Sequence, residues 1–207
     1  MSPRPYNSSQ RREAAQATRE RVVAAAYALL ADPVGVSAFT VDAVARRAGV
    51  ARMTVYNQFG AKDAVLEALF DALAARGGIH GIEGMARAFS QPDPLDGLRT
   101  MFDVLARYYS ADRTVKRRLH ALARLQPDVA RALALREDRR RRGIRTLLER
   151  MEAQHGTPPA ARRDELVCLL FAMTSFESFD TMAGANGSFQ EVAPVIASAA
   201  HVIVTAR

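Results

Sequence analysis

The sequence predicts an all-α protein. Ala, Leu and Arg, which favour helices, are abundant, and the alternation of β-branched and polar residues typical of strands is almost absent. Hydrophobic residues make up 49% and charged residues 25% of the 207 residues, as in a globular protein of one or two domains. Apolar residues recur at intervals of three and four, as expected for helices that pack on a core.

The first third of the chain predicts an arm followed by four helices. Residues 1–17 are polar and have no periodic apolar face, so we expect a flexible arm there. A first helix is expected over residues 18–30, with an apolar stripe at Val22, Ala25, Ala26, Leu29 and Leu30. Three further helices are expected over residues 41–48, 51–59 and 62–76.

Local signals mark the ends of the short helices. Thr40 is a favourable N-cap for the helix over residues 41–48, and Phe39 before it can pack on Val44 as a hydrophobic staple. Gly49 suits the left-handed conformation that ends this helix. The sequence therefore predicts two short helices joined by a tight turn.

A glycine-rich segment separates this region from the rest of the chain. We expect residues 77–92 to be a linker, with a possible short helix near residues 83–90, and a domain boundary between residues 77 and 93. A first domain would then span residues 18–76 and a second domain residues 93–207. Five longer helices are predicted in the second domain, over residues 95–110, 113–125, 128–154, 159–183 and 189–206.

Two short helices around a glycine-containing turn form a predicted helix-turn-helix, whose second helix enters the major groove of DNA. Six apolar residues have the spacing to pack this motif on the first helix: Val44, Ala45, Ala48, Val50, Val55 and Phe59. The second helix is thereby left with Arg52, Met53, Thr54, Tyr56 and Asn57 near its exposed face.

The exposed side chains suit contacts to DNA. Arg52 can donate to guanine, Asn57 can pair with adenine, and Thr54 with Met53 can contact a thymine methyl group. Phosphate oxygens suit Thr40, Tyr56 and Lys62. From periodicity alone, a three-helix core with an accidental polar face explains the pattern equally well.

Three segments carry a family resemblance: residues 18–26, 39–50 and 54–66. They include the turn Ala48-Gly49-Val50, the ending Tyr56-x-x-Phe59 of the second helix, and Lys62 at the start of the next. Together they resemble the N-terminal DNA-binding region of the TetR/AcrR family of transcriptional regulators over residues 18–70. The remaining two thirds of the chain resembles the family in being helical and of suitable length.

The resemblance implies roles for individual residues. Tyr56 and Lys62 match the family's phosphate-contacting Tyr and Lys, and Thr40 matches its capping residue. The base-reading turn is occupied by Arg52, Met53 and Thr54, where Met53 replaces the small residue, often Gly, that is common in the family. A bulkier side chain there bears on the operator sequence rather than on the docking mode.

The resemblance also implies partners. Such proteins are homodimers, here through the helices at about residues 159–183 and 189–206, which we find apolar on most of their faces. They bind a palindromic double-stranded DNA operator, usually as repressors, and release it when a small-molecule effector enters the C-terminal domain. The expected architecture is therefore an N-terminal three-helix DNA-binding domain and a C-terminal helical domain for effector binding and dimerisation.

An effector pocket with apolar walls and a few polar groups is expected in the second domain. The candidate residues are Phe102, Leu105, Tyr109, His120, Phe171, Phe176 and Glu177. For each of them, packing in the core or at a dimer interface is the favoured alternative. Glu177 on an otherwise apolar helix suits a cationic ligand or an ion pair with an arginine.

The largest concentration of charge lies outside the helix-turn-helix. The net charge is +7, and residues 113–145 contain twelve basic against three acidic residues. The apolar stripe Val115, Leu119, Leu122 and Leu125 favours a solvated basic face on the opposite side of that helix. An alternative function is a basic helical protein that uses this block, Arg113 to Arg145, to bind nucleic acid without sequence preference.

Enzyme chemistry and membrane insertion are not expected. The four histidines have no metal-ligand spacing, and no nucleophile elbow or P-loop is present, so we predict no catalytic residue, metal or cofactor. A helical ligand-binding or catalytic domain that acts without DNA is a weaker reading. The single cysteine, Cys168, favours a reducing compartment, and the absence of an export or membrane signal predicts a cytoplasmic protein.

Overall fold

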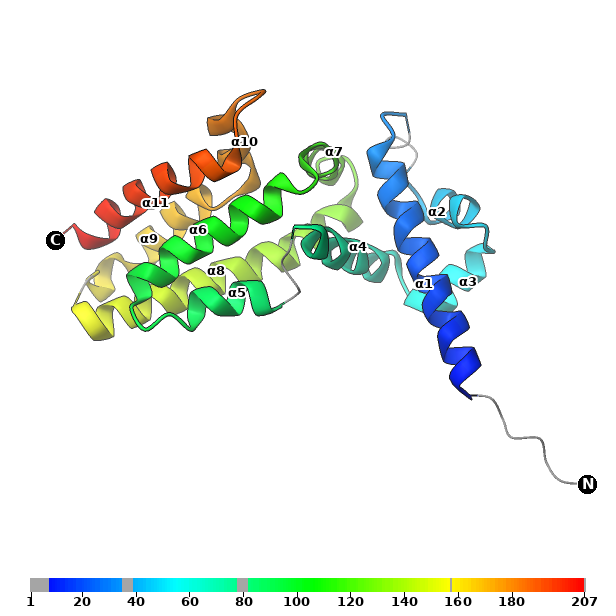
Figure 1. The fold of residues 1–207 in the computed structure, drawn as a ribbon, viewed down its shortest axis with the longest axis horizontal. Helices are drawn as coiled ribbons and strands as arrows, with labels where there is room; N and C mark the ends of the chain where they lie inside the picture. Colours follow the sequence, from blue (N-terminus) through cyan, green and yellow to red (C-terminus); the bar gives the residue numbers. More distant parts are fainter. Residues whose placement is uncertain (1–7, 35–38, 78–81, 157, 207) are drawn as a thin grey trace, which may run out of the picture. The chain divides into compact units, whose positions relative to one another are not determined.

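The computed structural model describes residues 8–34, 39–77, 82–156 and 158–206 (Figure 1). These residues form helices and connecting turns with no strand among them, which confirms the all-α prediction. In chain order the helices are α1 (Ser8–Ala31), α2 (Val41–Ala48), α3 (Arg52–Phe59), α4 (Lys62–Arg76), α5 (Ile82–Phe89), α6 (Pro94–Ser110), α7 (Arg113–Ala123), α8 (Pro127–His155), the 3-10 turn η2 (Ala160–Arg162), α9 (Arg163–Met173), α10 (Phe176–Ala183) and α11 (Phe189–Thr205).

Helices α1, α2 and α3 pack against one another around a small apolar core (Figure 1). The predicted stripe of α1 is buried throughout, from Val22 to Leu30, and so are Val44 and Ala45 of α2 and Val55 of α3. Because burial of these side chains is what joins three short helices, the periodic pattern alone was sufficient to predict this bundle.

The first helix is longer than predicted. It begins at Ser8 rather than at Thr18, so residues 8–17, expected in a flexible arm, are helical; residues 1–7 lie outside the described residues. The segment from Gln10 to Ala17 is rich in Gln, Arg, Glu and Ala, which propagate a helix without burying a face. Apolar periodicity was therefore the wrong criterion for the start of this helix.

The turn between α2 and α3 has the predicted geometry. The hydroxyl of Thr40 accepts a hydrogen bond of 3.2 Å from the backbone N–H of Ala43, which caps α2. Gly49 follows at φ 66° and ψ 36°, and its N–H donates to the carbonyls of Ala45 and Arg46. Gly49 has no side chain and so adopts this left-handed conformation without strain. The conformation sets the direction in which α3 leaves the turn.

The chain divides into two compact units that cut across the predicted boundary. One unit comprises the described chain up to Ala72 together with Arg117–Ala132, and the other comprises Leu73–Lys116 and the chain from Leu133 onward. In the first unit, the guanidinium of Arg118 on α7 donates to the carbonyls of Leu30, at 2.9 Å, and Ala31, in the last turn of α1. These carbonyls have no partner within the helix, so Arg118 caps α1 and holds the 117–132 segment in this unit.

The second unit contains the larger core. Helix α6 packs against α5, α10 and α11, and α9 packs against α10 and α11. The helix predicted over residues 159–183 is broken at Thr174 and Ser175, where the Ser175 hydroxyl caps α10. The carbonyl of Thr174 instead accepts hydrogen bonds from Tyr109, at 3.0 Å, and Arg140, at 2.9 Å. Two distant donors thus stabilise this helix end in addition to the local Ser175 cap.

We predict that Arg118→Ala lowers the free energy of unfolding by about 1 kcal/mol, because it leaves the last carbonyls of α1 without a donor. Urea unfolding at neutral pH measures this. The control is Arg124→Ala, which removes an equal charge from an exposed side chain and is expected to change stability by less than about 0.5 kcal/mol. Equal effects of the two substitutions would contradict a capping role for Arg118.

Candidate nucleic-acid interface

Helix α3 is buried on one face and open on the other. Val55 and Phe59 are buried, whereas Arg52 and Asn57 are exposed and Met53 retains 66% of its accessible surface. Thr54 and Tyr56 are half-buried between these faces. Of the predicted base-reading side chains, Arg52, Met53 and Asn57 therefore lie on the free face of the helix, and Thr54 lies at its edge.

The C-terminal end of α3 is held by α1. The guanidinium of Arg19 lies 4.2 Å from the centre of the Phe59 ring and donates to the carbonyl of Gln58. Arg19 is thus a positioning residue rather than a solvated charge on the outer face of α1. Its cation–π contact and its hydrogen bond both restrict how α3 can turn about its own axis.

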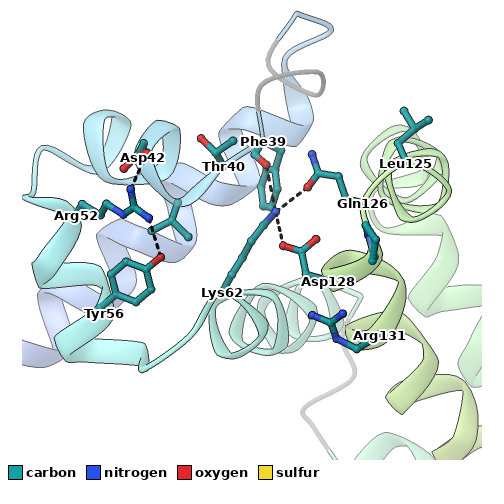
Figure 2. Close-up of a pocket in the computed structure, with 12 residues that line it drawn as sticks. Phe39, Thr40, Asp42, Arg52, Tyr56, Lys62, Leu125, Gln126, Asp128 and Arg131 are labelled. Atoms are coloured by element: carbon teal, nitrogen blue, oxygen red, sulfur yellow. Dashed lines mark hydrogen bonds and ion pairs between the residues drawn. The ribbon is translucent and has the colours of Figure 1, made fainter.

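Arg52, the predicted guanine reader, is oriented by two neighbours. Its guanidinium donates to Asp42 Oδ2 and to the hydroxyl of Tyr56, both at 3.2 Å (Figure 2). The hydrogen bond to Tyr56 and the charge of Asp42 raise the pKa of Arg52. Three of the five N–H donors of an arginine remain for other acceptors when two are used in this way.

Lys62, a predicted phosphate contact, is largely enclosed, with 17% of its side chain exposed. Its ammonium forms a 2.9 Å ion pair with Asp128 and donates to Gln126 Oε1 at 2.7 Å and to the Phe39 carbonyl at 3.3 Å (Figure 2). The ion pair joins the start of α4 to the start of α8. Sequence reasoning missed Gln126 and Asp128, because a separation of more than sixty residues leaves no local pattern that pairs them with Lys62.

The environment of Asp128 favours its charged form. Burial by itself raises the pKa of this carboxyl, but hydrogen bonds from Lys62 and from the backbone N–H of Val129 outweigh it, so the pKa lies below its ordinary value. At neutral pH the Asp128 carboxylate is therefore a permanent anion beside the Lys62 ammonium.

An open cleft of about 620 Å³ collects these side chains within the first unit (Figure 2). Four of the seven predicted DNA contacts line it, namely Thr40, Arg52, Tyr56 and Lys62, and the other three, Met53, Thr54 and Asn57, lie on α3 outside it. The opposite wall comes from the α7–α8 turn and includes Leu125, Gln126, Asp128 and Arg131. Leu125, expected in the buried stripe of its helix, is instead exposed because α7 ends at Ala123.

The seven predicted effector residues do not form a single group in the structure. Phe102, Leu105, Tyr109 and Phe176 are buried in the core of the second unit, where the ring of Tyr109 lies 5.5 Å from those of Phe176 and Phe179 in edge-to-face contact. Burial raises the pKa of Tyr109, whose hydroxyl donates to a backbone carbonyl. Aromatic packing thus occupies the place where the prediction puts a ligand.

The other three candidates are not part of this aromatic group. Phe171 is half-buried with the guanidiniums of Arg140 and Arg141 at 4.4 and 4.2 Å from its ring centre. Glu177 is exposed on α10. His120 belongs to the first unit, so the structure assigns it to a different unit from the others. The effector set remains a prediction.

Several members of the basic block are not solvated. Arg113 forms a 2.6 Å ion pair with Asp180, Arg118 caps α1, and Arg140 donates to Tyr109 and Thr174. Lys116 is buried against the ring of Tyr108, and burial lowers its pKa to about 8. A solvated face therefore describes this block only in part, because these four side chains reach inward to hold helix ends and aromatic rings.

Among the described residues, no group of three or more His, Cys, Asp or Glu side chains is placed to hold a metal ion. No single helix in the same part of the chain is long and apolar enough to cross a membrane, although the bent pair Ala160–Met173 and Phe176–Ala183 passes by length and composition alone.

A capped helix, a left-handed glycine turn and a second helix with a free polar face define a helix-turn-helix DNA-binding protein of the transcription-regulator class. Residues 22–69 match the family model described as "Bacterial regulatory proteins, tetR family". This match confirms the resemblance of the N-terminal region to the TetR family.

Two solved structures have a similar fold. The TetR family transcriptional regulator PfmR from Thermus thermophilus matches with a TM-score of 0.57 and 20% identity, over 90% of this chain and 100% of that one. A TetR-like transcriptional regulator from a Rhodococcus species matches with a TM-score of 0.60 and 20% identity, over 89% of this chain and 94% of that one. At this identity the likeness concerns the fold. No curated protein matches the sequence.

We predict that Asp128→Asn destabilises the protein by about 0.5 kcal/mol at pH 7, because the ion pair with Lys62 is partly exposed. The folded-state pKa of Asp128 is depressed, so its contribution is complete above the unfolded-state value, about 3.9, and is lost as pH falls through the folded value. Urea unfolding of both forms at pH 7 and near pH 3 measures this.

The control for this experiment is Asp103→Asn, at an exposed position of α6, which is expected to leave stability unchanged at both pH values. A destabilisation by Asp128→Asn that is equally large near pH 3 would show that the carboxylate charge is not its cause.

Proposed function

We propose that this protein is a TetR-type repressor that binds a palindromic DNA operator as a homodimer and is released by a small-molecule effector, acting in the cytoplasm. The observation that carries the proposal is the free face of α3, which presents Arg52, Met53 and Asn57 beside the phosphate-binding candidates Tyr56 and Lys62. Two such helices in a dimer would read half-sites about one helical turn, roughly 34 Å, apart.

The proposed contacts follow the chemistry of each side chain. Arg52 would donate to guanine, Asn57 would pair with adenine, and Met53 with Thr54 would contact a thymine methyl group. Thr40, Tyr56 and Lys62 would hold backbone phosphates and so place α3 in the major groove.

The last helices support the dimer. Four large apolar side chains on α9, α10 and α11 are exposed in the single chain: Leu169 at 41%, Met182 at 51%, Val195 at 58% and Val202 at 65%. Exposed apolar side chains of this size on neighbouring helices are typical of a surface that another protein covers. A second copy of α9–α11 is the partner that the TetR resemblance implies.

Release by an effector requires that the second unit influence the first. Helix α4 runs from Lys62 in the first unit to Arg76 in the second, so a tilt of this helix would move the phosphate-binding Lys62 and change the spacing of the two recognition helices. Effector and DNA would then weaken each other's binding by the same factor. The effector itself would occupy the second unit, with Phe102, Leu105, Tyr109, Phe171, Phe176 and Glu177 as candidate contacts.

We predict that the protein binds DNA from upstream of its own coding region at least ~10³-fold more tightly than a scrambled duplex at near-physiological salt. Arg52→Ala should weaken binding to the native fragment about tenfold or more, because it removes a base contact, and should leave the scrambled duplex nearly unaffected. Tyr56→Phe should weaken both duplexes by a similar factor, because it removes a phosphate contact. Fluorescence anisotropy measures all three proteins.

Replacing Arg139, Arg141 and Arg142 by Gln, with the structural Arg140 left in place, tests the alternative function in the same assay. Equal weak binding of the wild type to both duplexes, lost in this variant and retained in Arg52→Ala, would favour non-specific binding by the basic block. If Tyr56→Phe instead reduces the preference for the native fragment over the scrambled duplex, the roles assigned to Tyr56 and Arg52 are wrong.

We predict that Val195→Lys with Val202→Lys converts a dimer to a monomer, because two buried charges would face the partner subunit without a counter-ion. Sedimentation velocity measures the change, and binding to the native fragment should fall with it. The control is Leu135→Lys, at an exposed apolar position of α8. A wild-type protein that sediments as a monomer at micromolar concentration would contradict the proposed dimer.

A further inference from the structure

The charges that line the cleft of the first unit do not balance. Three cations, Arg52, Lys62 and Arg131, face two carboxylates, Asp42 and Asp128. Asp42 is paired with Arg52 at 3.2 Å and Asp128 with Lys62 at 2.9 Å. Arg131 is exposed, and within the described residues no carboxylate is found within ion-pair distance of it. The cleft therefore has a surplus of one positive charge, which is located on Arg131.

Arg131 stands beside the phosphate-binding candidates, although it comes from another part of the chain. It lies in the first turns of α8, three residues after Asp128, and so follows Asp128 along one side of this helix. Figure 2 shows its guanidinium at the mouth of the cleft below the carboxylate of Asp128, which holds Lys62. Thr40 and Tyr56 line the same cleft from the helix-turn-helix.

This arrangement suits a phosphodiester. A guanidinium offers parallel N–H donors that match two phosphate oxygens, and one phosphate carries the single negative charge that balances the cleft. The Lys62 ammonium adds positive charge beside this site, while its three N–H donors serve Asp128, Gln126 and the Phe39 carbonyl. A phosphate that approaches Lys62 from the open side would meet Arg131 next to it.

We propose that Arg131 binds a backbone phosphate of DNA beside Lys62, so that the DNA interface extends beyond the helix-turn-helix to the start of α8. The contact is independent of base sequence and sets the position of α3 along the duplex. This inference rests on the proposed function, and it assigns to one arginine of the basic block a role that the other arginines do not share.

The test compares Arg131→Gln with Arg142→Gln in the full-length protein. Arg142 is an exposed arginine of the same helix and lies outside the cleft, so both variants lose one positive charge and the change in net charge is matched. Anisotropy is recorded on the upstream fragment and on a scrambled duplex between about 50 and 200 mM salt. Circular dichroism melting verifies that both variants are folded.

Arg131→Gln is expected to weaken both duplexes by the same factor, roughly fivefold, and to reduce the slope of log affinity against log salt by about 0.9, which corresponds to one lost phosphate contact. Arg142→Gln is expected to leave the slope unchanged.

Equal effects of Arg131→Gln and Arg142→Gln in a protein that binds DNA would overturn this inference and leave the proposed function intact. A wild-type protein that binds neither duplex would overturn the proposed function and this inference with it.

A third arm titrates inorganic phosphate without DNA at constant ionic strength. Saturable thermal stabilisation that Arg131→Gln abolishes, with DNA binding unchanged, would assign the cleft to a free phosphorylated molecule and overturn the DNA contact.

Discussion

The Lys62 ammonium is the interaction on which the candidate interface depends. It binds the carbonyl that precedes α2, an amide in the α7–α8 turn and a carboxylate at the start of α8, so two segments far apart in the chain meet at the cation that begins α4. A buried or half-buried ammonium must find acceptors, since leaving it without them is costly. The chain satisfies it with groups that come from outside the helix-turn-helix, and this brings residues 117–132 into the DNA-binding unit.

Arginine serves several physical tasks in this protein. Arg19 and Arg118 hold the ends of helices, Arg140 supports the break between α9 and α10, and Arg52 is oriented for contact with a partner. Each task uses the same planar set of donors, and what differs is whether the acceptors are backbone carbonyls of this chain or groups outside it. A high count of arginine in a stretch of sequence is therefore a poor measure of its affinity for nucleic acid.

Most of the fold followed from the sequence, and the exceptions have identifiable causes. The bounds of α2, α3, α6 and α11 agree with prediction because caps, glycines and apolar stripes mark them locally. The start of α1 was placed too late, since an exposed helix of good helix formers has no apolar stripe. The break at Thr174 was missed because its stabilising donors, Tyr109 and Arg140, lie on other helices. Some of the residues predicted to contact an effector are core residues, because the ring of Tyr109 packs against that of Phe176.

The helical class, the helix-turn-helix and the residues on the free face of α3 could all be predicted from the amino-acid sequence, because helix periodicity, capping and turn geometry are local properties. Three pairings became visible in the folded chain alone: Lys62 is held by Asp128 and Gln126, Arg118 caps α1, and Arg131 shares a cleft with Tyr56. Side chains such as these meet through the packing of helices separated by tens of residues. No periodicity within either segment encodes which charge will find which partner, so this information exists only in the three-dimensional arrangement.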